Sequence, residues 1–478
     1  MNDQNLAIHR HPHLRILIPL VVAFAFLMEQ LDSTIITTAI PDMAVSLHTT
    51  PVRLNLAITA YVLTLAVFIP LSGWLADRFG ARRIFVTALA VFTAGSALCG
   101  IADSFAMLVA TRILQGLGGA MMTPVGRLIL LRSFPRSELV TAMTYTTLPA
   151  LLGPILGPLL GGVLTTYFSW RWIFYVNLPI GLLGCALAMR YIEDLPGERT
   201  SSFDFSGFML FGCGIGLLQL GLDDVGHSTF PAGVTITLLL ASAALLALFV
   251  RHARRTPVPI VDTALFRQRS FTVATLAGGL CRIALNATPF LLPLMLQVGF
   301  GLSAMTSGSL TFLGSAGAIV VRLFISRLLR ALGFARVLTG SALMATAVLA
   351  GFAAIQQHTP RSLIAAYVVI AGLVRSIQFM SSNTLAYCDV PANQLSRATS
   401  LGGLIQQLTV SFGVSMAAVL LSLITLHGGA LTVARFHEVF LVLAILPLLA
   451  LPGFLRLRPE DGVQVSGHRP RAKFSRGS

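Results

Sequence analysis

Two carboxylates lie close together in the first apolar stretch of the chain, at Glu29 and Asp32. They are three residues apart, so on a helix their side chains share one face. Burial and mutual repulsion both disfavour the charged forms of neighbouring carboxylates, which strengthens their hold on protons. Because charge deep in a membrane segment is costly and usually functional, the pair is a candidate site for exchanging a proton with a cation.

Three arginines also fall within apolar stretches, at Arg112, Arg282 and Arg375. A guanidinium does not release its proton, so Arg112 can influence a carboxylate but cannot relay protons. An ion pair between Arg112 and a carboxylate would be the purely structural alternative to a proton site. Arg282 and Arg375 have no deep acidic partner in the second half, and two interpretations stay open. Their side chains either extend to the membrane surface or face water and attract anionic groups.

The remaining polar residues exclude several kinds of chemistry. Lys473 is the single lysine and no Gly-rich loop precedes it, so an ATP-binding P-loop is absent. Neither the serine elbow of hydrolases nor a His-Glu-x-x-His zinc pair occurs. The five cysteines show no paired spacing, which argues against disulfides and metal clusters. We therefore expect no enzyme activity, no cofactor and no metal site.

The composition places these residues in a membrane protein. The chain is 55% hydrophobic and 11% charged, whereas a soluble domain carries about 25% charged residues. Apolar runs long enough to cross roughly 30 Å of hydrocarbon as helices recur along the whole chain. The expected fold class is an all-α polytopic membrane protein with 14 transmembrane helices. The expected spans are 16–40, 54–75, 84–102, 106–128, 139–166, 172–191, 205–222, 232–250, 270–296, 304–324, 335–355, 362–386, 399–425 and 436–455.

The distribution of charge gives the orientation of these spans. The net charge is +15, and 26 of the 33 Lys and Arg residues lie in every second loop, at the adjoining span ends or in the two tails. Only 4 lie in the alternate loops, and 3 lie deep within spans. This asymmetry follows the positive-inside rule, so it accounts for the charge without a nucleic-acid partner. It predicts a multi-pass protein of the bacterial inner (plasma) membrane with both termini in the cytoplasm.

Two long hydrophilic connections divide the chain, from Glu193 to Phe203 and from Arg251 to Arg269. They separate six spans from two, and those two from six more. The expected parts are an N-terminal six-helix bundle in 1–200, two interposed transmembrane helices in 201–262, a C-terminal six-helix bundle in 263–460 and a basic cytoplasmic tail in 461–478.

One loop sequence recurs at matching places in the two halves. Residues 73–83 read GWLADRFGARR, and residues 326–336 read SRLLRALGFAR. Leu, Gly and the final Arg coincide, while Arg330 replaces Asp77 in the second copy. Repeated halves are typical of secondary transporters.

Two further motifs lie inside spans. Residues 108–119, LVATRILQGLGG, surround Arg112. Residues 153–162, GPILGPLLGG, place glycines four apart, which lets helices approach closely. The prolines of this segment remove backbone donors and permit bending where protein covers the freed carbonyls. A role in packing alone is the alternative for this segment.

These motifs, with 31–41 (LDSTIITTAIP), resemble those of the major facilitator superfamily, in its fourteen-helix drug:H+ antiporter branch (EmrB/QacA type). The resemblance covers nearly the whole chain and implies the major facilitator fold, two six-helix bundles plus two extra helices. It implies a link of Arg112 to proton transfer. It also implies cytoplasmic gating by Gly73, Asp77, Arg78, Gly80, Arg82 and Arg83, and an antiporter motif in Gly153, Pro154, Gly157, Pro158, Gly161 and Gly162. Thr37 departs from the pattern, which usually has Asn there, and Glu29 lies outside the motif.

We expect a proton-coupled secondary active exporter of small amphipathic, cationic drugs that works by alternating access. The substrate class comes from the resemblance, and the carboxylates come from the sequence. One alternative is export of a specific metabolite or siderophore, for which anionic groups would suit Arg282 and Arg375. The other is a non-transporting membrane sensor or assembly partner. The candidate residues of a substrate cavity are Gln30, Tyr61, Tyr145, Arg282, Asn286, Arg375, Gln378, Asn383, Gln406 and Gln407.

The expected partners are a small-molecule substrate, protons and the lipid bilayer, without nucleic acid. The chain is expected to act as a monomer, with a periplasmic adaptor protein as an optional partner. We assign Asp32 as the main coupling carboxylate, with Glu29 tuning it or binding a cationic substrate directly.

Overall fold

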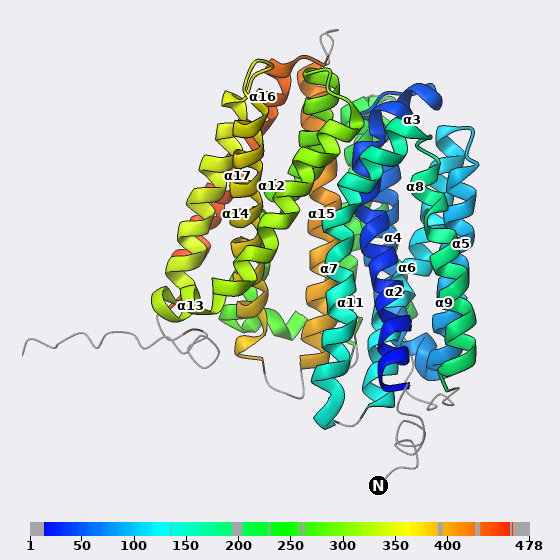
Figure 1. The fold of residues 1–478 in the computed structure, drawn as a ribbon. Helices are drawn as coiled ribbons and strands as arrows, with labels where there is room; N and C mark the ends of the chain where they lie inside the picture. Colours follow the sequence, from blue (N-terminus) through cyan, green and yellow to red (C-terminus); the bar gives the residue numbers. More distant parts are fainter. Residues whose placement is uncertain are drawn as a thin grey trace, which may run out of the picture.

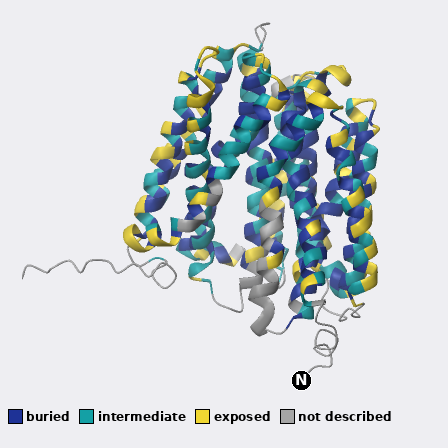
Figure 2. Ribbon diagram, in the orientation of Figure 1, coloured by how far each residue is buried: buried dark blue, intermediate teal, exposed yellow. Residues whose placement is uncertain are grey.

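The computed structural model describes residues 14–134, 136–193, 203–227, 230–256, 259–260, 263–390, 395–425, 431–458 and 461. Within these ranges the chain is helical and contains no strand. The helices run roughly parallel as a long bundle, with the first half of the chain on one side and the second half on the other (Figure 1). Exposed residues lie along the outer helices of this bundle (Figure 2). Many of the exposed residues are large and apolar, as expected for helices that contact lipid.

The first half forms six long helices joined by short elements. The long helices are α2 (Leu14–Ile35), α4 (Asn55–Phe79), α5 (Ala81–Gly100), α6 (Phe105–Ser133), α7 (Arg136–Tyr167) and α9 (Asn177–Tyr191). The short elements are η2 (Ile36–Thr38), α3 (Ile40–Ser46) and α8 (Trp172–Tyr175). Two helices follow, α10 (Phe205–His227) and α11 (Ala232–Ala253).

The second half contains four long helices, a broken pair and short connecting turns. The long helices are α12 (Arg269–Leu294), α13 (Ala304–Gly351), α14 (Arg361–Cys388) and α15 (Leu395–Thr425), and the broken pair is α16 (Val433–Leu443) and α17 (Ile445–Leu455). The turns are η3 (Thr263–Arg267), η4 (Met295–Gly299) and η5 (Phe352–Ala354). Helix α13 is bent at Gly333, where the backbone is not helical. The bend divides α13 into two helical segments.

Twelve helices among the described residues are long and apolar enough to cross a membrane. The two other expected spans, 139–166 and 304–324, fall in α7 and in the part of α13 that precedes Gly333. Both segments are helical, and both include residues whose side chains lie outside the description. The prediction of an all-α polytopic membrane protein is confirmed, and fourteen spans are compatible with the structure.

Two glycines show that the loop repeat is structural. Gly80 separates α4 from α5 with φ 93° and ψ 136°, and Gly333 bends α13 with φ 75° and ψ 164°. These residues occupy the same position in the two copies of the repeat. Because L side chains rarely adopt positive φ, glycine is needed at both places. The same backbone turn therefore connects matching helices of the two halves.

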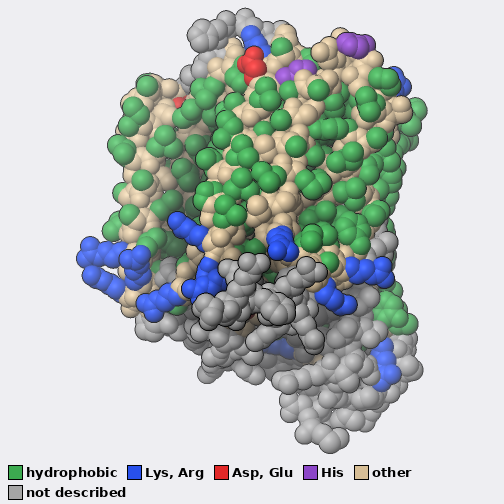
Figure 3. Space-filling view, turned by 90° about the vertical axis from the view of Figure 1, so that its left-hand side faces the viewer, with side chains coloured by type: hydrophobic (Ala, Val, Ile, Leu, Met, Phe, Trp, Pro, Cys, Tyr) green, Lys and Arg blue, Asp and Glu red, His purple; other side chains and the backbone are tan. Residues whose placement is uncertain are grey.

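The basic side chains gather near one end of the bundle, as Figure 3 shows for one face of the molecule. We call this the arginine-rich end; it includes Arg82 and Arg132 of the first half and Arg254, Arg269 and Arg330 of the second. Helix α2 begins at this end and α17 ends at it (Figure 1). The positive-inside rule predicts that such an end faces the cytoplasm.

Among the described residues, the largest buried apolar cluster that the two halves share lies at the opposite end. Buried residues of both halves, such as Ile35 and Ile173 with Leu291 and Phe440, form one cluster there. Buried residues nearer the arginine-rich end form two separate clusters, with Phe85 and Val125 in the first half and Phe271 and Leu338 in the second. Helices α7 and α13, and α4 and α15, make the main contacts between halves.

Helix α10 packs against α11 and α15 and also touches α4. Its buried Gln219 donates a short hydrogen bond to Ser415 of α15 and accepts one from Ser411 at 3.3 Å. The division of the chain at 200, 262 and 460 falls at or beside residues outside the description, as does the tail 461–478 beyond Asp461. That division stays a prediction.

Candidate functional site

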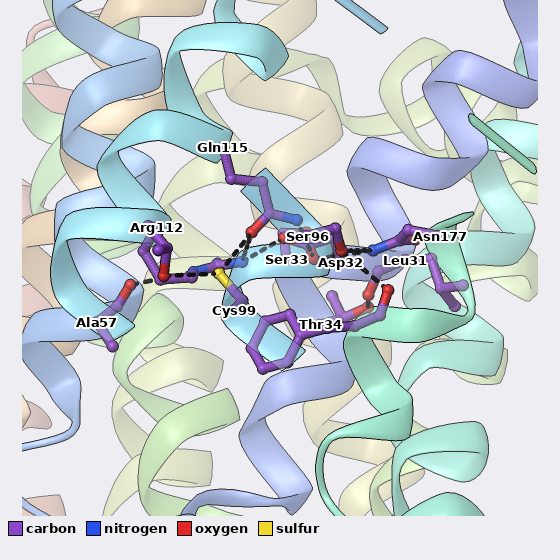
Figure 4. Close-up of polar contacts among 12 residues, drawn as sticks. Leu31, Asp32, Ser33, Thr34, Ala57, Ser96, Cys99, Arg112, Gln115 and Asn177 are labelled. Atoms are coloured by element: carbon purple, nitrogen blue, oxygen red, sulfur yellow. Dashed lines mark hydrogen bonds and ion pairs between the residues drawn. The ribbon is translucent and has the colours of Figure 1, made fainter. Parts of the chain in front are cut away.

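Asp32 lies in a fully buried ion pair inside the first half (Figure 4). Its Oδ2 accepts a hydrogen bond of 2.6 Å from Nη1 of Arg112, and its Oδ1 accepts one of 2.8 Å from Nε2 of Gln115. A third donor, Nδ2 of Asn177, lies 3.1 Å from Oδ1. The carboxylate therefore has three donors from two other helices, α6 and α9. A buried charge needs such compensation, because desolvation is expensive.

Arg112 is held from several directions. Its Nη1 also donates to Oε1 of Gln115 at 2.7 Å, and its Nε donates to the carbonyl oxygen of Ala57 on α4 at 3.3 Å. The guanidinium lies over the ring of Tyr61, 4.1 Å from the ring centre, where cations are attracted to the π face. Its Nη2 is buried without a hydrogen-bond partner among the described residues. One nitrogen of the Arg112 guanidinium, Nη2, can therefore still donate a hydrogen bond to another acceptor.

The sequence did not reveal the polar residues that complete this site. Asn177 donates to Ser96 Oγ at 3.0 Å as well as to Asp32, and Ser96 donates to the carbonyl of Phe174 at 2.9 Å. Gln115, Ser96 and Asn177 are all fully buried. Gln115 stands one turn after Arg112 within the motif 108–119, and Asn177 interrupts an apolar stretch. Both were visible signals, since an amide in an apolar span needs a partner.

Glu29 occupies a separate environment one turn away on α2. Its Oε2 accepts a hydrogen bond of 2.5 Å from Oγ1 of Thr123 on α6, and its side chain is buried. The guanidinium of Arg127 is close enough to attract it electrostatically. Glu29 and Asp32 both face α6, as the three-residue spacing predicts. The structure brings Arg112 to Asp32, however, and gives Glu29 different neighbours.

Glycines allow the helices around the ion pair to lie this close. A Cβ on Gly95 of α5 would lie 2.8 Å from the Cα of Gln115, and a Cβ on Gly118 of α6 would lie 2.5 Å from the amide nitrogen of Phe92. Neither space admits a side chain. The glycines after Arg112 in the motif 108–119 therefore serve packing that positions Gln115 beside Asp32.

The antiporter motif lies against α2 along one face of α7. A Cβ on Gly153 would meet Gln30, one on Gly157 would meet Thr34, and one on Gly161 would meet Ile35 and Thr38. The hydroxyl of Thr34 is also 3.3 Å from the carbonyl oxygen of Gly153. These contacts bracket Asp32 on α2. Glycine spacing of four residues thus positions the helix that carries the carboxylate.

A second face of the same motif contacts the other half. A Cβ on Gly162 would lie 2.6 Å from the carbonyl oxygen of Ala304, and one on Gly308 of α13 would lie 2.2 Å from that of Pro158. Pro154 is half-buried. Helix α7 therefore touches both α2 and the second half, so a shift of α2 can be transmitted across the interface.

The residues of the gating motif lie at the arginine-rich end. Asp77 accepts a hydrogen bond of 2.7 Å from Arg132 of α6, in an ion pair that is partly exposed. Arg82 donates to the carbonyl oxygen of Met189 on α9 at 2.7 Å. Arg78 lies over the Trp74 ring, 5.5 Å from its centre, and Arg83 is exposed, with an interaction of its own. No atom lies within 4 Å of where a Cβ on Gly73 would be.

The predicted cavity residues do not form one group. Tyr61 is fully buried in the ion-pair site, and Gln378 is buried with hydrogen bonds to Ser341 and Ser382. Gln30 packs on Gly153. The remaining candidates are accessible to differing degrees: Tyr145 and Arg375 are exposed, Asn286, Asn383, Gln406 and Gln407 are half-buried, and Arg282 is buried. Asn286 contacts Arg375 and follows Arg282 by one turn of α12.

Comparison with known proteins identifies the family. Residues 22–414 match the Major Facilitator Superfamily. This range contains the ion pair, the gating motif and the antiporter motif. The chain belongs to the Major Facilitator Superfamily.

Relatives and solved structures agree with membership of this superfamily. The chain is 38% identical to the Cronobacter sakazakii protein named "Putative multidrug resistance protein MdtD", over 95% of this chain and 97% of that one. It is 39% identical to the Klebsiella pneumoniae protein of the same name, over 93% and 94% of the two chains. The structural neighbours share only the fold. One is the nucleoside transporter NupG, with a TM-score of 0.63 and 13% identity over 92% of this chain and 98% of that one. Another is a POT family transporter in complex with 5-aminolevulinic acid, with a TM-score of 0.67 and 14% identity over 91% of this chain and 94% of that one.

These findings make the chain a membrane transporter of the Major Facilitator Superfamily whose curated relatives carry multidrug resistance names. Among its described residues, no group of three or more metal-binding side chains occurs.

Proposed function

We propose that the chain is a proton-coupled exporter of small amphipathic molecules across the bacterial inner membrane. The observation that carries this proposal is the buried Asp32–Arg112 pair, on a helix that packs along the antiporter motif of α7. A carboxylate with a fixed cationic partner holds its charge until a proton competes with that partner. Protonation of Asp32 would therefore release Arg112 and change the packing of α2.

Movement of α2 would reach the other half through α7. Gly157 and Gly161 leave no space between α2 and α7, and Gly162 leaves none between α7 and α13. Tightly packed helices transmit small shifts because they cannot absorb them. The halves share a core away from the arginine-rich end, which supports a state closed on the side that the positive-inside rule predicts to be outside. Proton and substrate would then alternate in one transport cycle.

Transport by purified protein in liposomes tests this proposal. A pH gradient imposed across the membrane should drive substrate movement against its concentration gradient, and collapsing the pH gradient with an ionophore should stop it. Counterflow, in which unlabelled substrate exchanges for labelled substrate, needs no gradient. Absence of both activities for every probe would favour the sensor or assembly partner. Counterflow without gradient-driven transport would show that the chain transports substrate, and would disprove only its coupling to protons.

Asp77 offers a test of gating at the arginine-rich end. The Asp77–Arg132 pair is partly exposed and lies within one half, so it adds about 0–1 kcal/mol to stability. We expect Asp77→Asn to leave the melting temperature nearly unchanged while slowing turnover, because charge pairs at such positions exchange between two states. The melting temperature and the initial transport rate are measured together. Unaltered transport would remove Asp77 from the gating mechanism.

Glu29 is expected to distinguish substrates by charge. It is a buried acid outside the main ion pair, with Thr123 as its hydrogen-bond donor. Glu29→Gln keeps that bond and removes the charge, so it should weaken transport of a cationic dye and spare a neutral analogue. The measurement is the ratio of the transport rates of the cationic dye and the neutral analogue, compared between the variant and the wild type. An equal loss for both dyes would mean that Glu29 acts in coupling or packing instead.

A further inference from the structure

The second half contains two guanidinium groups in the middle of adjacent helices, Arg282 on α12 and Arg375 on α14. Arg282 lies over the ring of Phe379, 5.3 Å from its centre, and Nη2 of Arg375 lies 3.4 Å from Oδ1 of Asn286. Asn286 follows Arg282 by one turn, and Phe379 follows Arg375 by one turn. The two arginines therefore occupy neighbouring turns of the same contact between α12 and α14.

Neither side chain can reach the membrane surface. Arg282 follows the start of α12 by 13 residues, and Arg375 follows the start of α14 by 14. At 1.5 Å per residue these distances are roughly 20 Å, which is longer than an arginine side chain. Extension to the lipid headgroups, which the sequence left open, is therefore excluded by the helix bounds.

Both arginines face the inside of the protein. Arg375 is exposed, yet it shares a stripe of α14 with Val368 and Ser382, seven residues to either side, and both of these are buried. The lipid-exposed face of α14 is a different one, marked by Leu363 and Ile370. The surface of Arg375 is thus accessible from the interior.

The position of Arg282 also indicates that it faces the interior of the protein. Arg282 interacts electrostatically with Tyr387 of α14, and so does Arg127 of the first half. Tyr387 is therefore near an arginine of each half. This places Arg282 toward the first half, on the side where a transported molecule would lie.

No acidic side chain of the second half balances these charges. The sequence has no Asp or Glu from Thr263 to Cys388, nor from Val390 to His437, so α12, α13, α14 and α15 are free of acids. Nε of Arg282 is buried without a hydrogen-bond partner among the described residues. By contrast, Arg112 of the first half has Asp32. A buried cation requires a counter-charge, and these four helices supply none.

We propose that Arg282 and Arg375 bind the anionic group, a carboxylate or sulfonate, of an amphipathic substrate. Arginine suits such groups because its planar donors match their two oxygens. Phe379 supplies an apolar surface beside the anion. The inference rests on the proposed function, since it names the substrate class of the same transporter. It favours organic acids or zwitterions over the purely cationic drugs that the family resemblance implies.

Binding of three fluorescent probes with one apolar body tests this assignment: 1-pyrenebutyrate, its neutral amide and 1-pyrenebutylamine. Affinity is measured on purified protein in nanodiscs of zwitterionic lipid, without a pH gradient. Wild-type protein should bind the carboxylate more tightly than the amide. Arg282→Gln and Arg375→Gln should each weaken the carboxylate about tenfold and leave the amide within about twofold. Arg375→Lys, which keeps the charge, should retain part of the preference.

Arg361→Gln is the matched control, because Arg361 is an exposed arginine at the start of the same helix. It should bind all three probes as wild type does. Carboxylate affinity that both Gln variants leave unchanged, or a loss that is equal for the amide, would overturn the inference. Gradient-driven transport of the amide would show that the proposed function holds even if the arginines fail this test. Arginine-dependent binding without any gradient-driven transport would disprove proton coupling and keep the anion site.

Discussion

Asp32→Asn is expected to reduce gradient-driven efflux to the level of protein-free liposomes. The asparagine can accept the hydrogen bonds that Gln115 and Asn177 give to Oδ1 of Asp32, but it cannot take up and release a proton. It should still allow counterflow, since substrate binding does not require that proton. The assay imposes a pH gradient on liposomes and follows loss of a dye. Efflux that stays gradient-dependent would shift the coupling role to Glu29.

Loss of transport in Asp32→Asn could also come from loss of folded protein, and a double variant separates the two causes. Asp32→Asn leaves Arg112 charged, fully buried and without its carboxylate, which costs about 3–5 kcal/mol in comparable sites. Asp32→Asn combined with Arg112→Gln removes both charges, so its melting temperature should recover. Transport should not recover with it. Recovery of gradient-driven transport in the double variant would show that the pair only stabilises the fold.

Gly161→Ala is expected to have the second largest effect. A Cβ at this position would lie 2.4 Å from the carbonyl oxygen of Ile35 and 2.4 Å from Oγ1 of Thr38, and the backbone oxygen cannot rotate away. Helices α2 and α7 must separate, which costs about 1–3 kcal/mol as overpacking. Because α2 carries Asp32 and α7 contacts α13, transport should fall more than the loss of folded protein explains. Melting temperature and transport per folded molecule are measured together.

Gly340→Ala is the control for that substitution. Gly340 is also helical, and no atom lies within 4 Å of a Cβ placed there. Alanine should raise stability by about 0.5–1 kcal/mol, as it does in open helix positions, with transport unchanged. If Gly161→Ala behaves like this control, the contact between α2 and α7 does not couple the site to the other half.

Much of the fold could be predicted from the sequence because lipid imposes simple rules. A segment that crosses the membrane must be apolar, about 20 residues long and helical, so its limits appear as an uninterrupted run. The helices Asn55–Phe79 and Ala232–Ala253 lie within a few residues of the expected spans 54–75 and 232–250. The loop repeat indicated matching halves, and Gly80 and Gly333 confirm a shared backbone turn.

The site could be predicted only where a residue is costly by itself. Asp32, Glu29 and Arg112 were evident because charge in a span demands a reason. Gln115, Ser96 and Asn177 were not, since neutral polar side chains occur in many spans and gain a role only through their neighbours. The ion pair joins residues 80 positions apart, and the bond of Asn177 to Asp32 joins residues 145 apart. Spacing along one helix cannot show such contacts.

The tertiary structure alone decided how the charges are partnered. By sequence, the carboxylate that pairs with Arg112 was not fixed, although Asp32 was assigned the main coupling role. Arg282 and Arg375 had two interpretations. Because α6 packs closely on α2, Arg112 forms a hydrogen bond with Asp32, and Thr123 forms one with Glu29. The contact between α12 and α14 placed the other two arginines together, away from lipid and without an acid. The sequence determined which residues must be compensated, because desolvation depends on residue type and depth. Their partners depend on which helix faces meet, and only packing across the whole bundle sets that.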